Sequence, residues 1–177
     1  MPKHIAFLRA INVGGHVVKM EALRRLFEGL AFTQVETFIA SGNVIFDSSS
    51  EDIPALQQTI ERALQAALGY EVATFLRSPL SLQKIVSYRP FPNLDTTNGA
   101  LYVAFVANPP SHEAVNKLST YTNEIDQFQV KGCEIYWGCQ KKMSESKFSG
   151  AVLERVLGMP ATIRSISTIQ KLAAKYA

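Results

Sequence analysis

The sequence predicts an α+β protein made of two tandem ferredoxin-like (alpha-beta plait, βαββαβ) units with antiparallel sheets. The first observation is the order of the expected elements, which is β-α-β-β-α-β in each half, as in the ferredoxin-like unit. The second is that this order, followed by a further helix, begins again after residue 99. The third is that 47% of the 177 residues are hydrophobic, which is enough for a sizeable core.

The first half of the chain is divided by clear start and stop signals. Apolar residues at helical spacing predict helices, and short apolar runs bounded by turn residues predict strands. Pro54 suits the first turn of a helix, and Gly69 suits the position that ends it. The elements expected from these patterns are a strand over 4–9, a helix over 19–30, strands over 35–39 and 44–47, a helix over 54–68, a strand over 71–76 and a helix over 79–88.

Residues 89–99, RPFPNLDTTNG, form a connector that is rich in proline and asparagine, and the pattern restarts after it. The elements expected there are a strand over 101–107, a helix capped by 108–111 and ending near 121, strands over 125–130 and 133–137, a helix over 148–157, a strand over 161–164 and a helix over 166–175. We therefore predict a first subdomain over residues 1–88, including the helix after its last strand. A second subdomain over 100–177 includes the C-terminal helix.

The repeat is also visible in the letters of the sequence. Residues 77–85, RSPLSLQKI, align without a gap on residues 164–172, RSISTIQKL, with four identical positions and two more that stay aliphatic. Chance similarity between two amphipathic helix starts is the alternative. Because the order of elements repeats as well, we interpret the alignment as an internal duplication.

Composition excludes several classes of function. The formal charge of only +3 permits an anionic ligand but does not demand nucleic acid, because a dedicated nucleic-acid binder usually shows a concentrated basic stripe. No apolar run is long enough to cross a membrane, and the first residues enter a strand at once instead of a signal peptide. We therefore expect a cytoplasmic protein that does not contact a membrane.

Metal and cofactor chemistry is not indicated. Cys133 and Cys139 are too far apart for the usual zinc pair, and the histidines are scattered, so we expect no metal site and no cofactor. The carboxylates are spread along the chain as on a solvated surface.

Both central strands, IAFL and LYVAFVA, are apolar on two faces, which predicts that the other half of the chain or a second subunit covers the second face. Whether the protein forms a homo-oligomer therefore stays open.

The best candidate site is the loop that joins the first strand to the first helix. In a ferredoxin-like unit this loop and the hairpin between the second and third strands lie at the same edge of the sheet. Glycine backbone, a helix N-terminus and fixed positive charges together suit an anion or a phosphate-bearing ligand. The alternative is that the glycines only make the turn and the charges are solvated. The candidate ligand-binding residues are Arg9, Asn12, Gly14, Gly15 and Lys19 in the loop and Ser41, Gly42 and Asn43 in the hairpin.

Arg77 and Arg164 form a secondary candidate. Each precedes a serine that suits a helix N-cap, and each is expected at the sheet edge opposite the loop. They are either a paired anion site across the duplication or structural arginines that bind a carboxylate or backbone carbonyls. No catalytic residue is identified, although His16 has the pKa range of a general base.

Several motifs resemble a known bacterial family. Residues 8–15 (LRAINVGG), 18–20 (VKM) and 41–46 (SGNVIF) are similar to the signature of domain of unknown function 1697, and residues 162–164 and 168–172 are similar to its C-terminal motif. The resemblance implies tandem ferredoxin-like subdomains and implies no activity. Two departures are Ala10, where the family usually has glycine, and Ser165-Ile166-Ser167, where it usually has Asn-Trp-Asn.

Three hypotheses about function follow, and whether the protein is an enzyme stays open. The leading one is a binding or regulatory module for a small anionic ligand at the loop after the first strand. The second is a nucleic-acid-binding protein, which needs basic residues of both halves on one face. The third is an enzyme that acts on a phosphorylated or carboxylated small molecule, with His16 or Lys19 as the reactive group.

Overall fold

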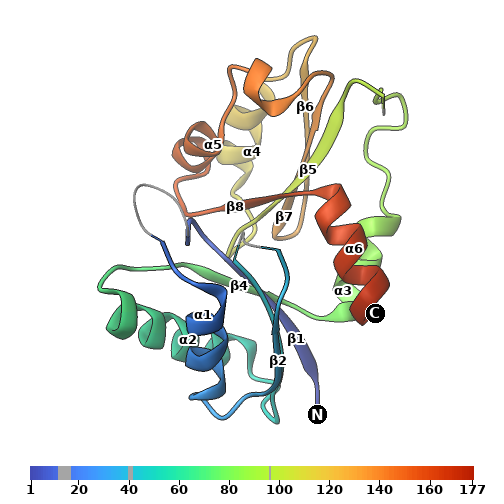
Figure 1. The fold of residues 1–177 in the computed structure, drawn as a ribbon. Coiled ribbons are helices and arrows are strands. Elements are labelled where there is room, and N and C mark those ends of the chain that lie inside the picture. Colours follow the sequence, from blue (N-terminus) through green and yellow to red (C-terminus); the bar gives the residue numbers. More distant parts are fainter. Residues whose placement is uncertain (12–16, 40–41, 96) are drawn as a thin grey trace. The chain divides into compact units, whose positions relative to one another are not determined.

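The fold of the chain divides into two compact units. A computed structural model describes residues 1–11, 17–39, 42–95 and 97–177. The first unit comprises Met1–Leu82 together with Ala177, and the second comprises Gln83–Tyr176. The helix α3 (Pro79–Ser87) contains the division, and each unit has a four-stranded antiparallel sheet (Figure 1).

The first unit has the ferredoxin-like topology. Its sheet has the order β2-β3-β1-β4, and every neighbouring pair is antiparallel. Figure 1 shows α1 and α2 side by side; α1 contacts β2, and α2 contacts β4. The elements are β1 (Lys3–Leu8), α1 (Met20–Glu28), β2 (Thr33–Thr37), β3 (Asn43–Asp47), α2 (Ile53–Leu68) and β4 (Thr74–Arg77).

The second unit repeats this topology, which confirms the predicted fold class. Its sheet has the order β6-β7-β5-β8, again antiparallel, and α4 contacts α5. The sequence patterns did not predict the short 3-10 helix η1 (Met143–Glu145). The other elements are β5 (Ala100–Phe105), α4 (His112–Ser119), β6 (Asp126–Lys131), β7 (Glu134–Cys139), α5 (Gly150–Leu157), β8 (Thr162–Ser165) and α6 (Ile166–Tyr176).

The repeated letters of the sequence correspond to a repeated local structure. The Ser78 hydroxyl accepts a hydrogen bond from the Ser81 backbone N–H at 3.1 Å, and the Ser165 hydroxyl accepts one from the Thr168 N–H at 3.3 Å, so matched serines cap α3 and α6. The two matched pairs of aliphatic residues are all buried: Leu82 with Ile169, and Ile85 with Leu172. The repeat therefore preserves a strand end, a helix cap and two core positions.

Both faces of each sheet are buried at the centre, as the apolar strands predicted. On the helix side of the first sheet, Ala6, Leu8 and Phe46 join the core beneath α1 and α2. The alternate residues Ile5 and Phe7 point to the other face and are also fully buried. In the second unit α6 contacts β5 and β8.

The second strand lies two residues earlier than the predicted range of 35–39. Its pairing with β3 shifts register between Thr33 and Glu36, which indicates a bulge. Ile39 has φ = +57°, is half-exposed and lies in a bend beyond the end of the strand, although its side chain is apolar. The apolar side chain of Ile39 therefore made the predicted strand end two residues too late.

A buried histidine lies in the core of the first unit. The His4 ring is 4% exposed and stacks on Phe46 with a centroid distance of 5.3 Å. Among the described residues neither ring nitrogen has a hydrogen-bond partner. Burial lowers the pKa of His4 from its usual 6.5, and the Ser50 backbone and the Asp47 and Glu51 carboxylates only partly oppose this.

The first unit is therefore expected to lose stability as the pH falls below about 6.5. In this range the unfolded chain protonates His4 while the folded chain does not, so the unfolded state binds more protons and the free energy of unfolding decreases. The decrease should stop below the lowered folded pKa. Urea unfolding at about pH 7.5 and pH 5 should show a smaller loss in His4→Phe than in wild type. An equal loss in both proteins would contradict this role, and the exposed His112→Gln serves as the control.

Candidate functional site

The end of β1 and the β2–β3 hairpin meet at one end of the first sheet. The Leu8 backbone N–H donates to the Gly42 carbonyl oxygen at 2.8 Å, and Phe7 lies opposite Asn43 in the antiparallel pairing. Arg9 follows directly, and its backbone N–H donates to the Ala73 carbonyl at 2.9 Å. Four candidates lie outside the described residues, as does His16: Asn12, Gly14, Gly15 and Ser41.

Two positive residues flank the loop between β1 and α1 along the chain. Arg9 is half-buried at the end of β1, and Lys19 is exposed at the residue before the helix. Lys19 is the residue before α1; it has extended backbone angles, and its side chain makes no capping hydrogen bond. The unpaired N–H groups of a helix start carry a partial positive charge, so this end of α1 favours an anion.

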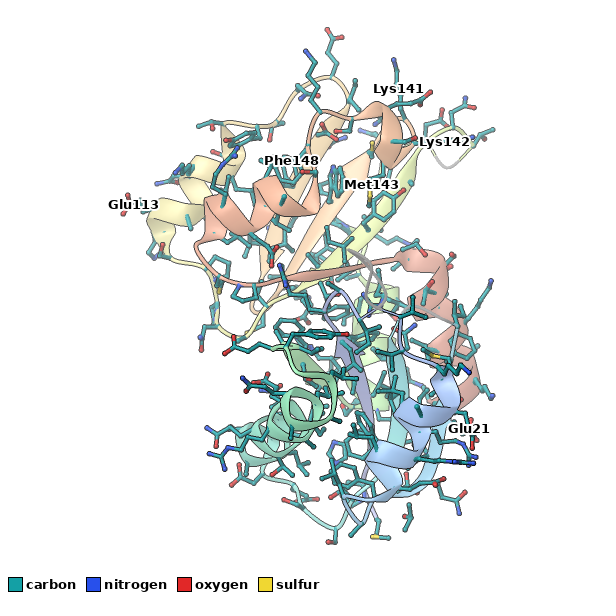
Figure 2. All side chains as sticks on the ribbon, turned by 60° about the vertical axis from the view of Figure 1, so that its left-hand side comes forward. Glu21, Glu113, Lys141, Lys142, Met143 and Phe148 are labelled. Carbon is teal, nitrogen blue, oxygen red and sulfur yellow. The ribbon has the colours of Figure 1, made fainter. Side chains whose placement is uncertain are left out.

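The one acidic residue in the first turn of α1 is already neutralised by its own helix. Arg24 and Arg25 both donate to the Glu21 carboxylate. Figure 2 shows Glu21 on the exposed side of α1. The hydrogen bonds from Arg24 contribute most to lowering the pKa of Glu21, so that it stays ionised and paired. Glu21 therefore opposes an anion at the helix start less than an unpaired carboxylate would.

Gly42 and Asn43 have clear structural roles in the hairpin. The buried Asn43 side chain donates from Nδ2 to the Phe38 carbonyl at 2.9 Å, and the Phe38 backbone N–H donates to the Asn43 carbonyl at 3.0 Å. Gly42 has φ = +79°, and a Cβ there would lie 2.8 Å from Ile11 Cγ2. These contacts give Gly42 and Asn43 a structural part in shaping the end of the sheet.

Two substitutions at this end should differ in their effect on the free energy of unfolding. Gly42→Ala forces a Cβ into Ile11 and into a left-handed backbone, so we expect a loss of about 1–3 kcal/mol in the free energy of unfolding. Ala10 is exposed with φ = +51°, so Ala10→Gly should be neutral or stabilising by up to about 1 kcal/mol. Urea unfolding of both variants measures this. A neutral Gly42→Ala would contradict the close packing on Ile11.

Arg77 and Arg164 bind backbone carbonyls, which favours the structural interpretation of this pair. Arg77 Nη1 donates to the Leu76 carbonyl at 2.8 Å, and Arg164 Nη1 donates to the Ile163 carbonyl at 3.0 Å. Arg164 also donates to the Thr162 hydroxyl at 2.7 Å. Burial lowers the pKa of the Arg164 guanidinium to about 10, which leaves it charged at neutral pH.

A sequence profile of a protein of unknown function, DUF1697, matches residues 1–136 of the 177. The chain belongs to the DUF1697 family. Among solved structures, this DUF1697 protein is similar to the conserved bacterial protein SP0830 from Streptococcus pneumoniae over 99% of both chains, with a TM-score of 0.77 and 22% identity. That likeness concerns the fold alone, and it extends over both units. No protein with a curated description matches the sequence.

The two places at which this DUF1697 protein departs from the family signature are Ala10 and Ser165-Ile166-Ser167, and the structure describes both. Ala10 stands where the family usually has glycine, and its positive φ is the conformation that glycine adopts most easily. Ile166 stands where the family usually has tryptophan, and it lines a cavity of about 410 Å³ in the second unit. Sequence reasoning missed this cavity, because its walls come from the connector, β5 and α6.

Two features are absent from the described part of the chain. Within residues 1–11, 17–39, 42–95 and 97–177, no three His, Cys, Asp or Glu side chains are grouped so that they could hold a metal ion. Over the same ranges no helix combines the length and the apolar character that a membrane crossing requires.

Proposed function

We propose that this DUF1697 protein is a cytoplasmic bacterial binding or regulatory module for a small anionic ligand. The ligand binds at the end of the first sheet, where β1 ends and α1 begins. The observation that carries the proposal is the start of α1, where the Lys19 side chain makes no capping hydrogen bond; Lys19 and the half-buried Arg9 flank the loop that leads into this helix. A helix N-terminus favours an anion by about 0.3–1 kcal/mol, and adjacent cations add to this.

Each group has a distinct part in this proposal. Arg9 grips an oxyanion of the ligand through two parallel N–H groups, since a guanidinium matches a carboxylate or phosphate edge. Lys19 contributes a point charge at the helix start. Asn12, Gly14, Gly15 and Ser41 stay predicted ligand-binding residues by their residue types, and they lie outside the described residues. Gly42 and Asn43 hold the hairpin against the end of β1.

A thermal-shift screen tests the proposal. The ligands are inorganic phosphate, nucleotides, phosphosugars, carboxylates and short RNA, each on wild type and on Arg9→Ala, Lys19→Ala and Arg62→Ala. Arg62 is an exposed cation on α2 of the same unit and is the matched control. A ligand at about 100 times its Kd should add about 2.7 kcal/mol to the free energy of unfolding of wild type and of Arg62→Ala.

The same stabilisation should be lost in Arg9→Ala and reduced in Lys19→Ala, which removes an exposed side chain and should fold normally. Stabilisation that is equal in all four proteins would overturn the proposal, as would no stabilisation of wild type by any ligand. Binding to random RNA that falls steeply with salt would favour a nucleic-acid-binding protein instead. Turnover that disappears in His16→Ala while binding is retained would identify an enzyme.

A further inference from the structure

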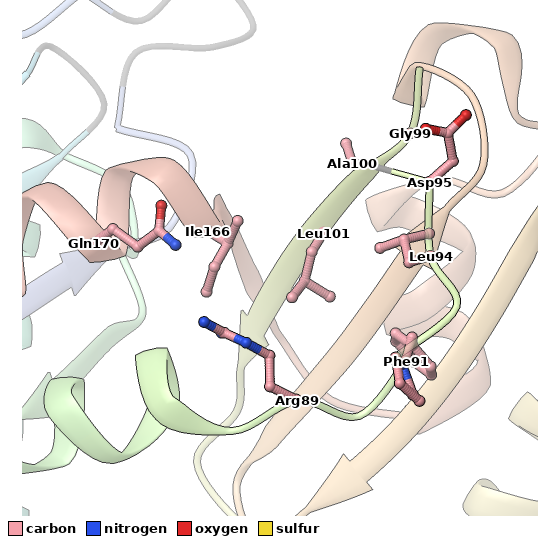
Figure 3. Close-up of a pocket in the computed structure, with 10 residues that line it drawn as sticks. Arg89, Phe91, Leu94, Asp95, Gly99, Ala100, Leu101, Ile166 and Gln170 are labelled. Atoms are coloured by element: carbon pink, nitrogen blue, oxygen red, sulfur yellow. The ribbon is translucent and has the colours of Figure 1, made fainter. Parts of the chain in front are cut away.

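A second candidate site lies wholly within the second unit and is independent of the proposed anion site. It is the cavity of about 410 Å³ between the 89–99 connector, the start of β5 and the start of α6 (Figure 3). Small-molecule pockets in proteins typically enclose about 300–1,000 Å³. The size therefore suits a small organic molecule and is too small for a peptide or a nucleic acid.

Apolar side chains make up most of the cavity wall. Phe91 and Leu94 of the connector, Leu101 of β5 and Ile166 of α6 surround it, and all four are half-buried. A cluster of partly exposed apolar groups around one cavity gains from burial by a ligand, at roughly 25 cal/mol for each Å² covered. The wall therefore favours a ligand with an apolar body.

The two ends of the cavity differ in charge. At one end Figure 3 shows the Arg89 side chain extending toward Ile166, near Gln170 of α6. Arg89 Nη1 donates to the Val86 carbonyl at 2.8 Å, which anchors a guanidinium that has five N–H donors in all. The Gln170 amide offers a further donor. This end suits a single planar anion.

Asp95 and Gly99 form the other end. The Asp95 carboxylate accepts hydrogen bonds from the Thr97 backbone N–H at 2.8 Å and from the Asn98 backbone and side chain at 3.3 Å. These bonds lower the pKa of Asp95 and keep it negative, the Thr97 bond contributing most. An anionic ligand is therefore oriented with its charge at Arg89 and its apolar part toward Phe91 and Leu94.

The cavity wall is held in place by close packing on β7. A Cβ at Gly99 would clash with the Asp95 carbonyl oxygen and would lie 2.7 Å from that of Cys139, so the connector packs directly against the strand end. A Cβ at Gly138 would lie 2.7 Å from Phe91 Cδ2, so the ring packs over a bare backbone. A wall fixed in this way loses little entropy when a ligand binds.

We infer that the second unit binds a small amphipathic monocarboxylate in this cavity. Arg89 and Gln170 bind the carboxylate, and the alkyl or aryl part of the ligand packs between Leu101 and Ile166. One guanidinium balances one carboxylate, whereas a phosphate dianion would need a second cation in the cavity wall. The lining residues include Arg89 as their one cation.

The test is a titration of the full chain with butanoate, hexanoate and octanoate, followed by amide NMR at fixed ionic strength. Affinity should rise with chain length, and the shifts should centre on Leu101, Ile166 and Gln170. The matching alcohols should bind about tenfold more weakly, because they lack the charge that Arg89 pairs with. Equal binding of acids and alcohols, or no binding of any acid to wild type, would overturn the inference.

Four variants assign the binding to this cavity. Arg89→Ala should weaken hexanoate binding about tenfold. Ile166→Trp should abolish binding by filling the cavity while leaving the circular dichroism spectrum unchanged. Arg155→Ala, an exposed cation on α5 of the same unit, should bind as wild type does. Arg9→Ala should also retain binding; its loss there would place the acid at the first unit and overturn the inference.

Discussion

Replacing Phe46 by alanine is expected to lower the free energy of unfolding by about 3–5 kcal/mol. Phe46 is fully buried in the core of the first unit, with ring centroids 4.3 Å from Phe32 and 5.6 Å from Phe27. Removing the ring leaves a cavity under α1 and deprives three aromatic neighbours, His4 included, of their contacts. The resulting cost should be the largest of any single substitution considered for the first unit.

Urea unfolding followed by far-ultraviolet circular dichroism measures this loss. Leu80→Ala is the matched control, because Leu80 is a large apolar residue that is 60% exposed. The control should change the free energy of unfolding by less than about 0.5 kcal/mol. A Phe46→Ala effect as small as that of Leu80→Ala would contradict the described core.

Asp126→Ala is expected to destabilise the second unit by about 2–4 kcal/mol. Asp126 is 2% exposed, and its carboxylate accepts from Trp137 Nε1 at 2.8 Å and from the Ser146 hydroxyl at 2.7 Å. The Ser146 oxygen in turn accepts from the Phe148 backbone N–H at 3.0 Å. One carboxylate thus joins β6, β7 and the segment after η1, and its loss leaves two donors unpaired.

Trp137 is the one tryptophan of the chain, so its fluorescence follows the second unit during urea unfolding. Asp126→Asn retains an acceptor and should cost less than Asp126→Ala. The exposed cations of the same segment, Lys141 and Lys142, provide the control, and Lys142→Ala should change stability little (Figure 2). Equal midpoints for Asp126→Ala and wild type would contradict the described network.

The fold was predictable because its signals are local. Pro54, Gly69 and the serine caps mark helix ends by their own backbone chemistry, and the order of elements then selects the ferredoxin-like topology. The apolar letters of the central strands also predicted correctly that both sheet faces are buried.

The remaining features depend on contacts between distant residues. The prediction that carboxylates are spread on a solvated surface was wrong for Asp126, whose burial depends on Trp137 and Ser146. For Arg77 and Arg164 the sequence favoured a structural role but could not name the partners, which are backbone carbonyls of neighbouring residues. The proline- and asparagine-rich composition of the 89–99 connector is typical of a plain linker, although its Arg89 and Phe91 line a cavity together with residues of α6.

The most direct test of the anion site is an amide NMR titration of the whole chain with inorganic phosphate, on wild type and on Lys19→Ala. We expect saturable changes in amide chemical shift that are confined to the end of β1, the start of α1 and Gly42. In Lys19→Ala the affinity obtained from these changes should be lower. Shifts that do not saturate, or that are spread evenly over both units in both proteins, would contradict this expectation.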